Sequence, residues 1–218
     1  MDISQPLDLG TAQCMVQNGM TFGIVRGWCS YGGFDSNVVG SIANMWSAGF
    51  AHVDSYMFPC AGQDATAQVN SFVSQLSSNG VQYGMIWFDI ETNGSDNCGW
   101  SDPADNCNYM QALVNAAAAN GVNYGIYASA YMWGSIMGDG CTVGGSNPLW
   151  YADYDGNADF GDWASFGGWS TPAMVCSFSR LLIPCLPLAF YRLAFRLWIW
   201  AQVEQQQLSA PPSSPLPA

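Results

Sequence analysis

Three segments of this chain repeat one pattern, in which a helical stretch ends at a glycine and an apolar strand follows. They read SAGFAHV from Ser47, SNGVQYG from Ser78 and ANGVNYG from Ala119. Glycine adopts the left-handed conformation that ends a helix at no steric cost. Strands that alternate with helices of about ten or more residues favour βαβ units. The pattern therefore predicts an α/β fold with a parallel sheet.

The strands and helices expected from this alternation run through most of the first 154 residues. Strands are recognised by short apolar runs and helices by apolar residues three and four apart. The expected strands are 21–28, 51–58, 83–91, 124–128 and 149–154, and the expected helices are 9–17, 38–48, 64–77, 103–119 and 131–136.

The polar residues near the ends of these strands favour a TIM-like (β/α) barrel over an open sheet. Parallel barrels carry their active sites at the carboxyl ends of the strands. Six polar side chains fall there: Arg26, Tyr56, Asp89, Glu91, Tyr127 and Asp153. No glycine-rich phosphate loop follows any expected strand, which disfavours a nucleotide-dependent enzyme.

The length and the charge balance narrow the function further. A chain of 218 residues fits one domain, and with 50% apolar residues it can bury a core. There are 16 acidic residues against four Lys and Arg, a net charge of −12, so nucleic acid is not an expected partner. The single histidine, His52, excludes a multi-histidine metal site. We expect a monomer without a metal or cofactor.

One expected strand concentrates the candidate chemistry. It ends in the sequence Asp89-Ile90-Glu91, and Glu91 is the only glutamate before residue 204. Residues two apart on a strand face the same side. Two carboxylates at the mouth of an aromatic-rich site suit glycosidic cleavage, with one as general acid and the other stabilising positive charge on the sugar. A D-x-E motif alone also occurs as a simple strand end or loop cap.

Five phrases of the sequence are characteristic in their order and spacing: DISQP at 2–6, VDSYMFP at 53–59, WFDIE at 87–91, GIY at 125–127 and WYADY at 150–154. Together they resemble glycoside hydrolase family 25, the Chalaropsis-type lysozymes or N-acetylmuramidases, and in particular its short, cysteine-containing eukaryotic branch. The resemblance covers about residues 1–174 and implies a modified (β/α) barrel. It also implies cleavage of the β-1,4 bond between N-acetylmuramic acid and N-acetylglucosamine in bacterial peptidoglycan.

The resemblance also assigns roles to individual residues. Glu91 matches the general acid, and Asp89 matches the residue that orients the N-acetyl group of the substrate, which acts as internal nucleophile. Asp2 matches an aspartate of the first strand. The residues expected to bind the sugar are Tyr56, Tyr127, Trp150 and Asp153.

The chain departs from the family pattern at both ends. It begins at the aspartate that the family places at the end of its first strand, so we expect that strand to be truncated. After Met174 no phrase matches the family's last strands, and all 24 glycines lie at or before Gly168. We therefore predict an incomplete barrel of residues 1–174 and an unrelated tail of residues 175–218. An unclosed barrel leaves exposed strand edges.

The tail has several interpretations. Its apolar stretch, 181–200, is long enough to span a bilayer, but it contains two prolines and two arginines, so we do not expect membrane association. An interfacial helix is a further alternative, and the Pro/Ser-rich segment 209–218 is typical of disorder. We favour translated non-coding sequence, because Val175-Cys176 can be encoded by GTATGT, a frequent start of an intron.

The cysteines indicate an oxidising compartment. Residues 1–174 contain six of them, and the spacing predicts a local disulfide between Cys98 and Cys107. Cys29 and Cys60 end neighbouring expected strands, so we expect a second disulfide between them, and Cys14 and Cys141 stay unassigned. A secreted protein or one of a lysosome or digestive vacuole is expected, with any signal peptide preceding Met1. The sequon at Asn93 lies two residues beyond Glu91, and we expect it to be unused.

Two alternatives to a muramidase remain at this point. An unclosed barrel allows an inactive glycan-binding or degenerate homologue. A chitinase-type hydrolase also uses acids in a D-x-E-like arrangement on a barrel strand, although the phrase from Asp2 to Pro6 favours the muramidase family.

Overall fold

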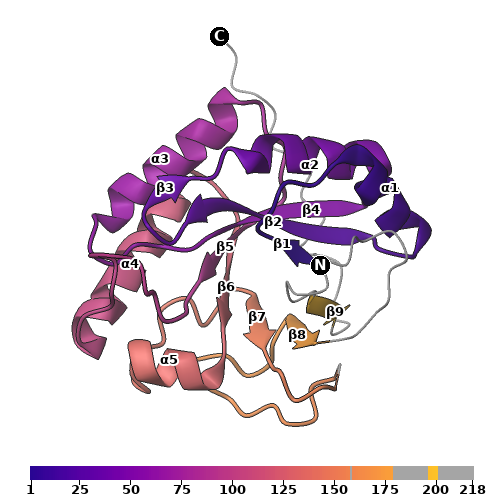
Figure 1. Cartoon of the computed structure of the whole chain (residues 1–218). Helices are drawn as coiled ribbons and strands as arrows, with labels where there is room; N and C mark the ends of the chain where they lie inside the picture. Colours follow the sequence, from indigo (N-terminus) through magenta and orange to yellow (C-terminus); the bar gives the residue numbers. More distant parts are fainter. Residues whose placement is uncertain (158, 179–195, 201–218) are drawn as a thin grey trace.

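A computed structural model describes residues 1–157, 159–178 and 196–200 of the chain. Strands and helices alternate along it as the sequence predicts (Figure 1). The helices are α1 (Leu9–Gln17), α2 (Asn37–Ala48), α3 (Ala65–Ser78), α4 (Pro103–Ala119) and α5 (Ala130–Ile136). The strands are β1 (Asp2–Ile3), β2 (Phe22–Cys29), β3 (Gly33–Phe34), β4 (His52–Met57), β5 (Ile86–Asp89), β6 (Tyr124–Ala128), β7 (Leu149–Ala152), β8 (Met174–Phe178) and β9 (Arg196–Trp200).

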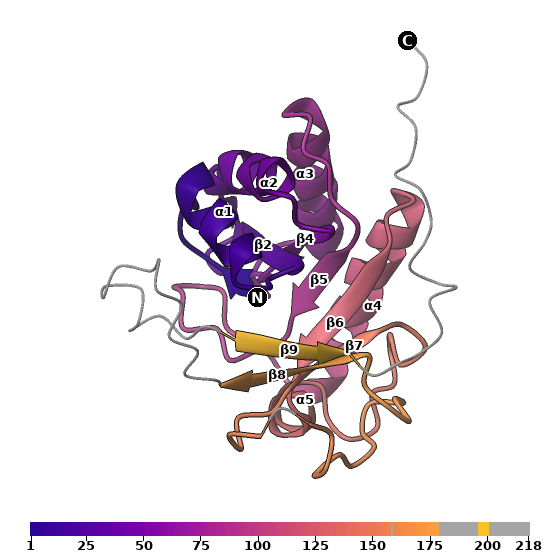
Figure 2. The same cartoon turned by 90° about the vertical axis from the view of Figure 1, so that its right-hand side faces the viewer.

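The strands form one curled sheet that does not close. Its order is β1-β2-β4-β5-β6-β7-β8-β9, with the short β3 paired to β2. Neighbours are parallel from β1 to β8, and β9 runs antiparallel to β8. Figure 2 shows β8 and β9 side by side at one end of the sheet. The predicted incomplete α/β barrel is confirmed.

The helices cover the outer side of the sheet and build the larger of two cores. In Figure 1 they follow one another in an arc from α1 and α2 through α3 and α4 to α5. The core between helices and sheet is fully apolar in its centre, with Val69, Phe72 and Leu76 of α3 and Leu113 of α4 all inaccessible to solvent. Burying a side chain of this size contributes about 1.5–3 kcal/mol, so the core between helices and sheet stabilises this unclosed half-barrel.

The repeated helix-to-strand junction has a common structure. The residue after α3 is Asn79, and its side-chain amide donates to the carbonyl of Gln75; the next residue, Gly80, has φ +64°. After α4, Asn120 donates to the carbonyl of Ala116 in the same way. The amide satisfies one of the carbonyls left open at a helix end, and the glycine turns the chain into the next strand.

Several element boundaries differ from the prediction: β5 begins at Ile86 and not at residue 83, β7 ends at Ala152 and not at residue 154, and the short β3 was not predicted. β5 ends at Asp89, so Glu91 lies in the bend after the strand rather than within it. β1 contains only two residues, as the truncated first strand implies. β8 and β9 were not predicted, because the change of composition at residue 174 concealed their short apolar runs.

The predicted division at residue 174 stays a prediction. β8 begins at Met174 and pairs in parallel with β7 through Cys176. The apolar stretch 181–200 lies outside the described residues except for β9, and the segment 209–218 lies wholly outside them. No helix in the described part of the chain is long and apolar enough to span a membrane.

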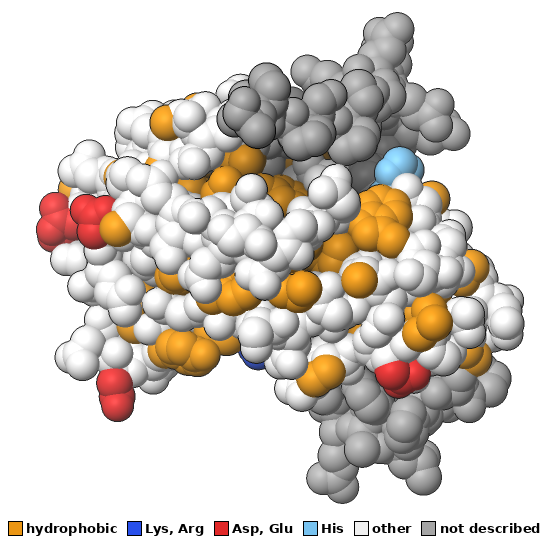
Figure 3. All heavy atoms as spheres, turned by 90° about the horizontal axis from the view of Figure 1, so that it is seen from above, with side chains coloured by type: hydrophobic (Ala, Val, Ile, Leu, Met, Phe, Trp, Pro, Cys, Tyr) orange, Lys and Arg blue, Asp and Glu red, His pale blue; other side chains and the backbone are white. Residues whose placement is uncertain are grey.

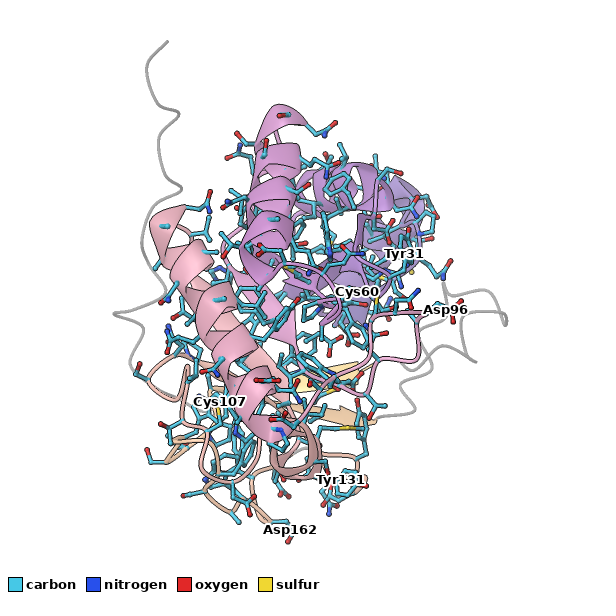
Figure 4. All side chains as sticks on the ribbon, turned by 90° about the vertical axis from the view of Figure 1, so that its left-hand side faces the viewer. Tyr31, Cys60, Asp96, Cys107, Tyr131 and Asp162 are labelled. Atoms are coloured by element: carbon cyan, nitrogen blue, oxygen red, sulfur yellow. A yellow bond between two sulfur atoms is a disulfide. The ribbon has the colours of Figure 1, made fainter. Side chains whose placement is uncertain are left out.

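Both predicted disulfides are wrong. Cys60 is bonded to Cys98, with their Cα atoms 4.4 Å apart, and Cys107 is bonded to Cys141. Cys107 lies within α4, whereas Cys98 lies in the preceding loop against the loop that follows β4, where Ala61 N donates to the carbonyl of Cys98. Cys29 is a buried thiol. Figure 4 shows Cys60 and Cys107 in separate parts of the molecule.

Candidate active site

The candidate acid, Glu91, follows β5 at the carboxyl edge of the sheet. Asp89 is the last residue of β5 and lies opposite Tyr127 of β6. Ile90 donates its N–H to the carbonyl of Tyr127 and is fully buried in the core under the helices. The alternation of sides therefore continues past the strand end, and Asp89 and Glu91 share the inner side.

The Glu91 side chain contacts the inner face of the sheet. The hydroxyl of Tyr127 donates to its Oε1 atom at 3.3 Å. The indole N–H of Trp100 donates to the Glu91 carbonyl at 2.7 Å and fixes the backbone of the bend. Glu91 is partly exposed and Asp89 is 8% exposed. One carboxylate is therefore within reach of a substrate, and the other is enclosed by protein.

Three aromatic rings, those of Trp87, Tyr127 and Trp150, pack against one another beside Glu91 and are called the aromatic floor. The ring of Tyr127 meets that of Trp150 at a centroid distance of 4.4 Å, and Trp150 meets Trp87 edge-on at 5.9 Å. All three side chains are at most 2% exposed and belong to the cluster inside the curled sheet. Edge-to-face pairs contribute about 0.5–1.5 kcal/mol beyond their burial, so the rings form a rigid floor.

A carboxyl group that was not among the predicted site residues holds these aromatic rings in place. Asp54 of β4 accepts hydrogen bonds from Trp87 Nε1 at 2.8 Å and from Met85 N at 2.9 Å. Burial raises the pKa of Asp54 to about 7, although both hydrogen bonds act in the opposite direction. Asp54 stands in the phrase Val53–Pro59, but nothing in that phrase indicates that the indole N–H of Trp87 would donate to it.

Two further predicted site residues come from the first half of the sheet. Asp2 in β1 lies opposite Ile24 of β2. Tyr56 of β4 lies between Arg26 of β2 and Trp87 of β5, and packs against the inner cluster. The sheet thus places Tyr56 on the same inner face as the aromatic floor.

Arg26 forms hydrogen bonds that join two segments of the fold. Its guanidinium donates to Asp35 Oδ2 at 2.9 Å and to the carbonyl of Ser4 at 3.1 Å. Asp35 in turn accepts from Asn37 N at the start of α2. These contacts tie the segment after β1 to the loop after β2.

The segment after β7 contributes Asp153 and Tyr154. Asp153 donates its N–H to the carbonyl of Cys176 in β8, and burial together with Asp155 raises the pKa of its carboxyl group. The Tyr154 hydroxyl lies 2.7 Å from that of Tyr127 and 3.9 Å from the Cys176 sulfur. Tyr154 was not selected from the sequence, although it ends one of the quoted phrases. The structure thus brings Tyr127, Trp150 and Glu91 together.

The loop after β5 is fixed by Asn93. Its amide donates to the carbonyls of Ser30 at 2.7 Å and Pro59 at 3.1 Å, and its side chain is 7% exposed. An amide in this position is enclosed by protein, which supports the expectation that the sequon is unused. In Figure 4, Tyr31 and Asp96, from the loops after β2 and β5, lie on the same side of the molecule.

The surface carries little charge on the face formed by the first helices. Figure 3 shows mostly uncharged side chains there, with a few scattered acids. Within residues 1–157, 159–178 and 196–200, no three His, Cys, Asp or Glu side chains gather as a bound metal ion would require.

Known proteins are similar to this chain in sequence and in fold. The family described as Lys-1, lysozyme-like protein 1, matches residues 1–175. A Dictyostelium discoideum protein named "Probable GH family 25 lysozyme 4" is 43% identical over 176 residues, which cover 80% of each chain.

Two solved structures have the same half-barrel. The muramidase from Acremonium alcalophilum superposes with a TM-score of 0.71 at 17% identity, covering 95% of this chain and 94% of that one. The family GH25 lysozyme from Aspergillus fumigatus gives 0.65 at 18% identity, covering 81% of this chain and 85% of that one. The fold and its relatives define a glycosidase of the lysozyme class. Within that class, the chain belongs to glycoside hydrolase family 25.

Proposed function

We propose that this lysozyme-like hydrolase cleaves the β-1,4 bond between N-acetylmuramic acid and N-acetylglucosamine in bacterial peptidoglycan. Glu91 is the general acid that protonates the leaving oxygen. Asp89 orients the N-acetyl group, whose carbonyl oxygen attacks the sugar carbon, and Asp2 completes the acidic site. The observation that carries the proposal is the hydrogen bond between Tyr127 and the Glu91 carboxyl group at the carboxyl edge of β5 and β6.

The different surroundings of the two carboxylates support different roles. A general acid must reach the leaving oxygen, and Glu91 is the partly exposed member of the pair. A residue that orients the substrate by hydrogen bonding needs a fixed position, and Asp89 is 8% exposed at the end of a strand. Substrate assistance of this kind is a known departure from the two-carboxylate mechanism.

The sugar-binding surface in this proposal is lined by Tyr56, Tyr127, Trp150 and Asp153. Trp150 and Tyr127 are largely covered, so they support the sugar mainly through the rigidity of the floor. Tyr56 and Asp153 are partly exposed and supply direct contacts. Aromatic faces with polar tips suit a ligand that is both apolar and rich in hydroxyl groups.

Replacing the acid tests the proposal. Glu91→Gln keeps the shape of the side chain but has no proton to donate, and general acid catalysis contributes about 10²–10⁴-fold. We expect clearing of bacterial cell walls to fall by that factor. Asp96→Asn is the matched control, because Asp96 is an exposed acid in the same loop. Unchanged clearing by Glu91→Gln would overturn the assignment.

A substrate comparison separates the remaining alternatives. A muramidase releases soluble fragments from peptidoglycan and not from chitin, whereas a chitinase-type hydrolase does the reverse. An inactive glycan-binding homologue binds cell walls without releasing fragments. We expect release from peptidoglycan alone.

We further infer that the protein acts outside the cell or in a lysosome or digestive vacuole. Two disulfides among the described residues suit an oxidising compartment. The net charge of −12 opposes binding to anionic cell walls at neutral pH. Protonation of carboxylates near pH 4–5 reduces this repulsion, so the proposal includes an acidic optimum.

A further inference from the structure

Two tyrosine hydroxyls form a short chain of hydrogen bonds that ends at Glu91. The hydroxyl of Tyr154 lies 2.7 Å from that of Tyr127, which donates to Glu91 Oε1 at 3.3 Å. Tyr127 is 1% exposed and held by Trp150, whereas Tyr154 follows β7 and is 49% exposed. The outer hydroxyl is therefore linked to Glu91 through the inner one.

The donor and acceptor in each of these two hydrogen bonds follow from the single hydrogen that each tyrosine hydroxyl carries. A phenol has one O–H to donate but can also accept. Because the hydrogen of Tyr127 points to Glu91, the hydrogen between the two hydroxyls comes from Tyr154. Tyr154 then donates to the Tyr127 hydroxyl, and Tyr127 donates to the Glu91 carboxylate. Hydrogen bonds in such a chain polarise and strengthen one another.

We propose that Tyr154 is a positioning residue, which acts through Tyr127 to stabilise the Glu91 carboxylate left after proton transfer. The inference rests on the proposed role of Glu91 as general acid. Hydrogen bonds to the ionised form of a carboxyl group favour that form, so the pair eases proton release to the leaving oxygen.

The position of Tyr154 depends on the last two parallel strands. Asp153 N donates to the carbonyl of Cys176, and the Cys176 sulfur lies 3.9 Å from the Tyr154 hydroxyl. Pairing of β7 with β8 thus holds the outer end of the chain. Among the described residues, the titratable groups next to the pair include Asp89, opposite Tyr127, and Asp153, which precedes Tyr154. Cys176 contacts Tyr154 and interacts with the buried amine of Met1. Tyr154→Phe leaves all of these groups in place.

The test is the pH profile of kcat/KM for Tyr154→Phe on soluble peptidoglycan fragments. Without the Tyr154 hydroxyl, the Tyr127 hydroxyl is a weaker hydrogen-bond donor to the Glu91 carboxylate. We expect the alkaline limb to move up by about 0.1–0.7 pH unit, which corresponds to a loss of about 10–30% of one hydrogen bond to a charged group, and the plateau to fall. Tyr83→Phe is the control, because Tyr83 precedes β5 at the opposite end of the strand.

The double variant distinguishes action through Tyr127 from a direct effect. Tyr127→Phe should move the limb in the same direction, and adding Tyr154→Phe to it should move the limb no further. An unmoved limb in Tyr154→Phe, or an equal shift in both backgrounds, would overturn the inference. If Glu91→Gln remains active, the proposed function itself fails, whatever the tyrosine variants do.

Discussion

Asp54 makes the stability of this protein depend on pH in an unusual direction. Burial raises the pKa of its carboxyl group from 3.8 to about 7. Below about pH 4 the folded and unfolded chains both hold this proton. Between about pH 4 and 7 only the folded chain holds it, so the free energy of unfolding falls as the pH rises. Above about pH 7 the contribution of Asp54 to the free energy of unfolding no longer changes with pH.

The size of the effect follows from the shift. A displacement of about three pKa units, at about 1.4 kcal/mol each, amounts to roughly 4 kcal/mol. Asp54→Asn removes this titration. The new amide NH₂ group cannot accept a hydrogen bond, so one of the two N–H donors, Trp87 Nε1 or Met85 N, loses its acceptor. This loss lowers the free energy of unfolding by about 1–3 kcal/mol at every pH. The wild type should therefore be the more stable protein near pH 4 and lose that advantage by pH 7.

Thermal unfolding of both proteins from pH 4 to 8 measures the difference. For a chain of this size, about 4 kcal/mol corresponds to a relative change in Tm of roughly 8–16 °C. Asp96→Asn, at an exposed acid, should run parallel to the wild type. A constant difference between wild type and Asp54→Asn, or one that grows in favour of the wild type with rising pH, would refute the reasoning.

Two further predictions concern the loop after β5 and the cross-links. A Cβ at Gly62 would lie 1.7 Å from the carbonyl oxygen of Asn97, whereas one at Gly94 meets nothing within 4 Å. Gly62→Ala should therefore lower stability by about 1–3 kcal/mol or more in urea unfolding, and equal stability of the two alanine variants would contradict the structure. Peptide mapping without reduction should link Cys60 to Cys98 and Cys107 to Cys141. Replacing the second pair by serine should cost about 4 kcal/mol, and a peptide linking Cys98 to Cys107 would contradict the assignment.

Periodicity was sufficient to predict most of the fold. All five helices and the central strands lie where the apolar spacing places them, because each has one face in the core. The strand β8 escaped prediction because its five residues carry too little pattern and lie at a change of composition. The end of β5 was placed two residues late, since the alternation of sides continues past the last ladder pairing at Asp89.

The residues around the candidate acid were only partly predictable. Glu91, Tyr127 and Trp150 stood in phrases that could be matched to a family. The contacts of Asp54 and Tyr154 depend on how side chains from different strands and loops pack together in space, and a single sequence does not contain that information. The disulfides failed for the same reason, because loop spacing does not state which loops lie together.

Product analysis tests the central claim most directly. Hydrolysis at C1 of N-acetylmuramic acid leaves that sugar at every new reducing end. Peptidoglycan digested by the protein, reduced with borohydride and analysed by mass spectrometry should yield reduced N-acetylmuramic acid, and digestion with Glu91→Gln should yield almost none. Reduced N-acetylglucosamine as the product, or equal yields from the two proteins, would contradict the account.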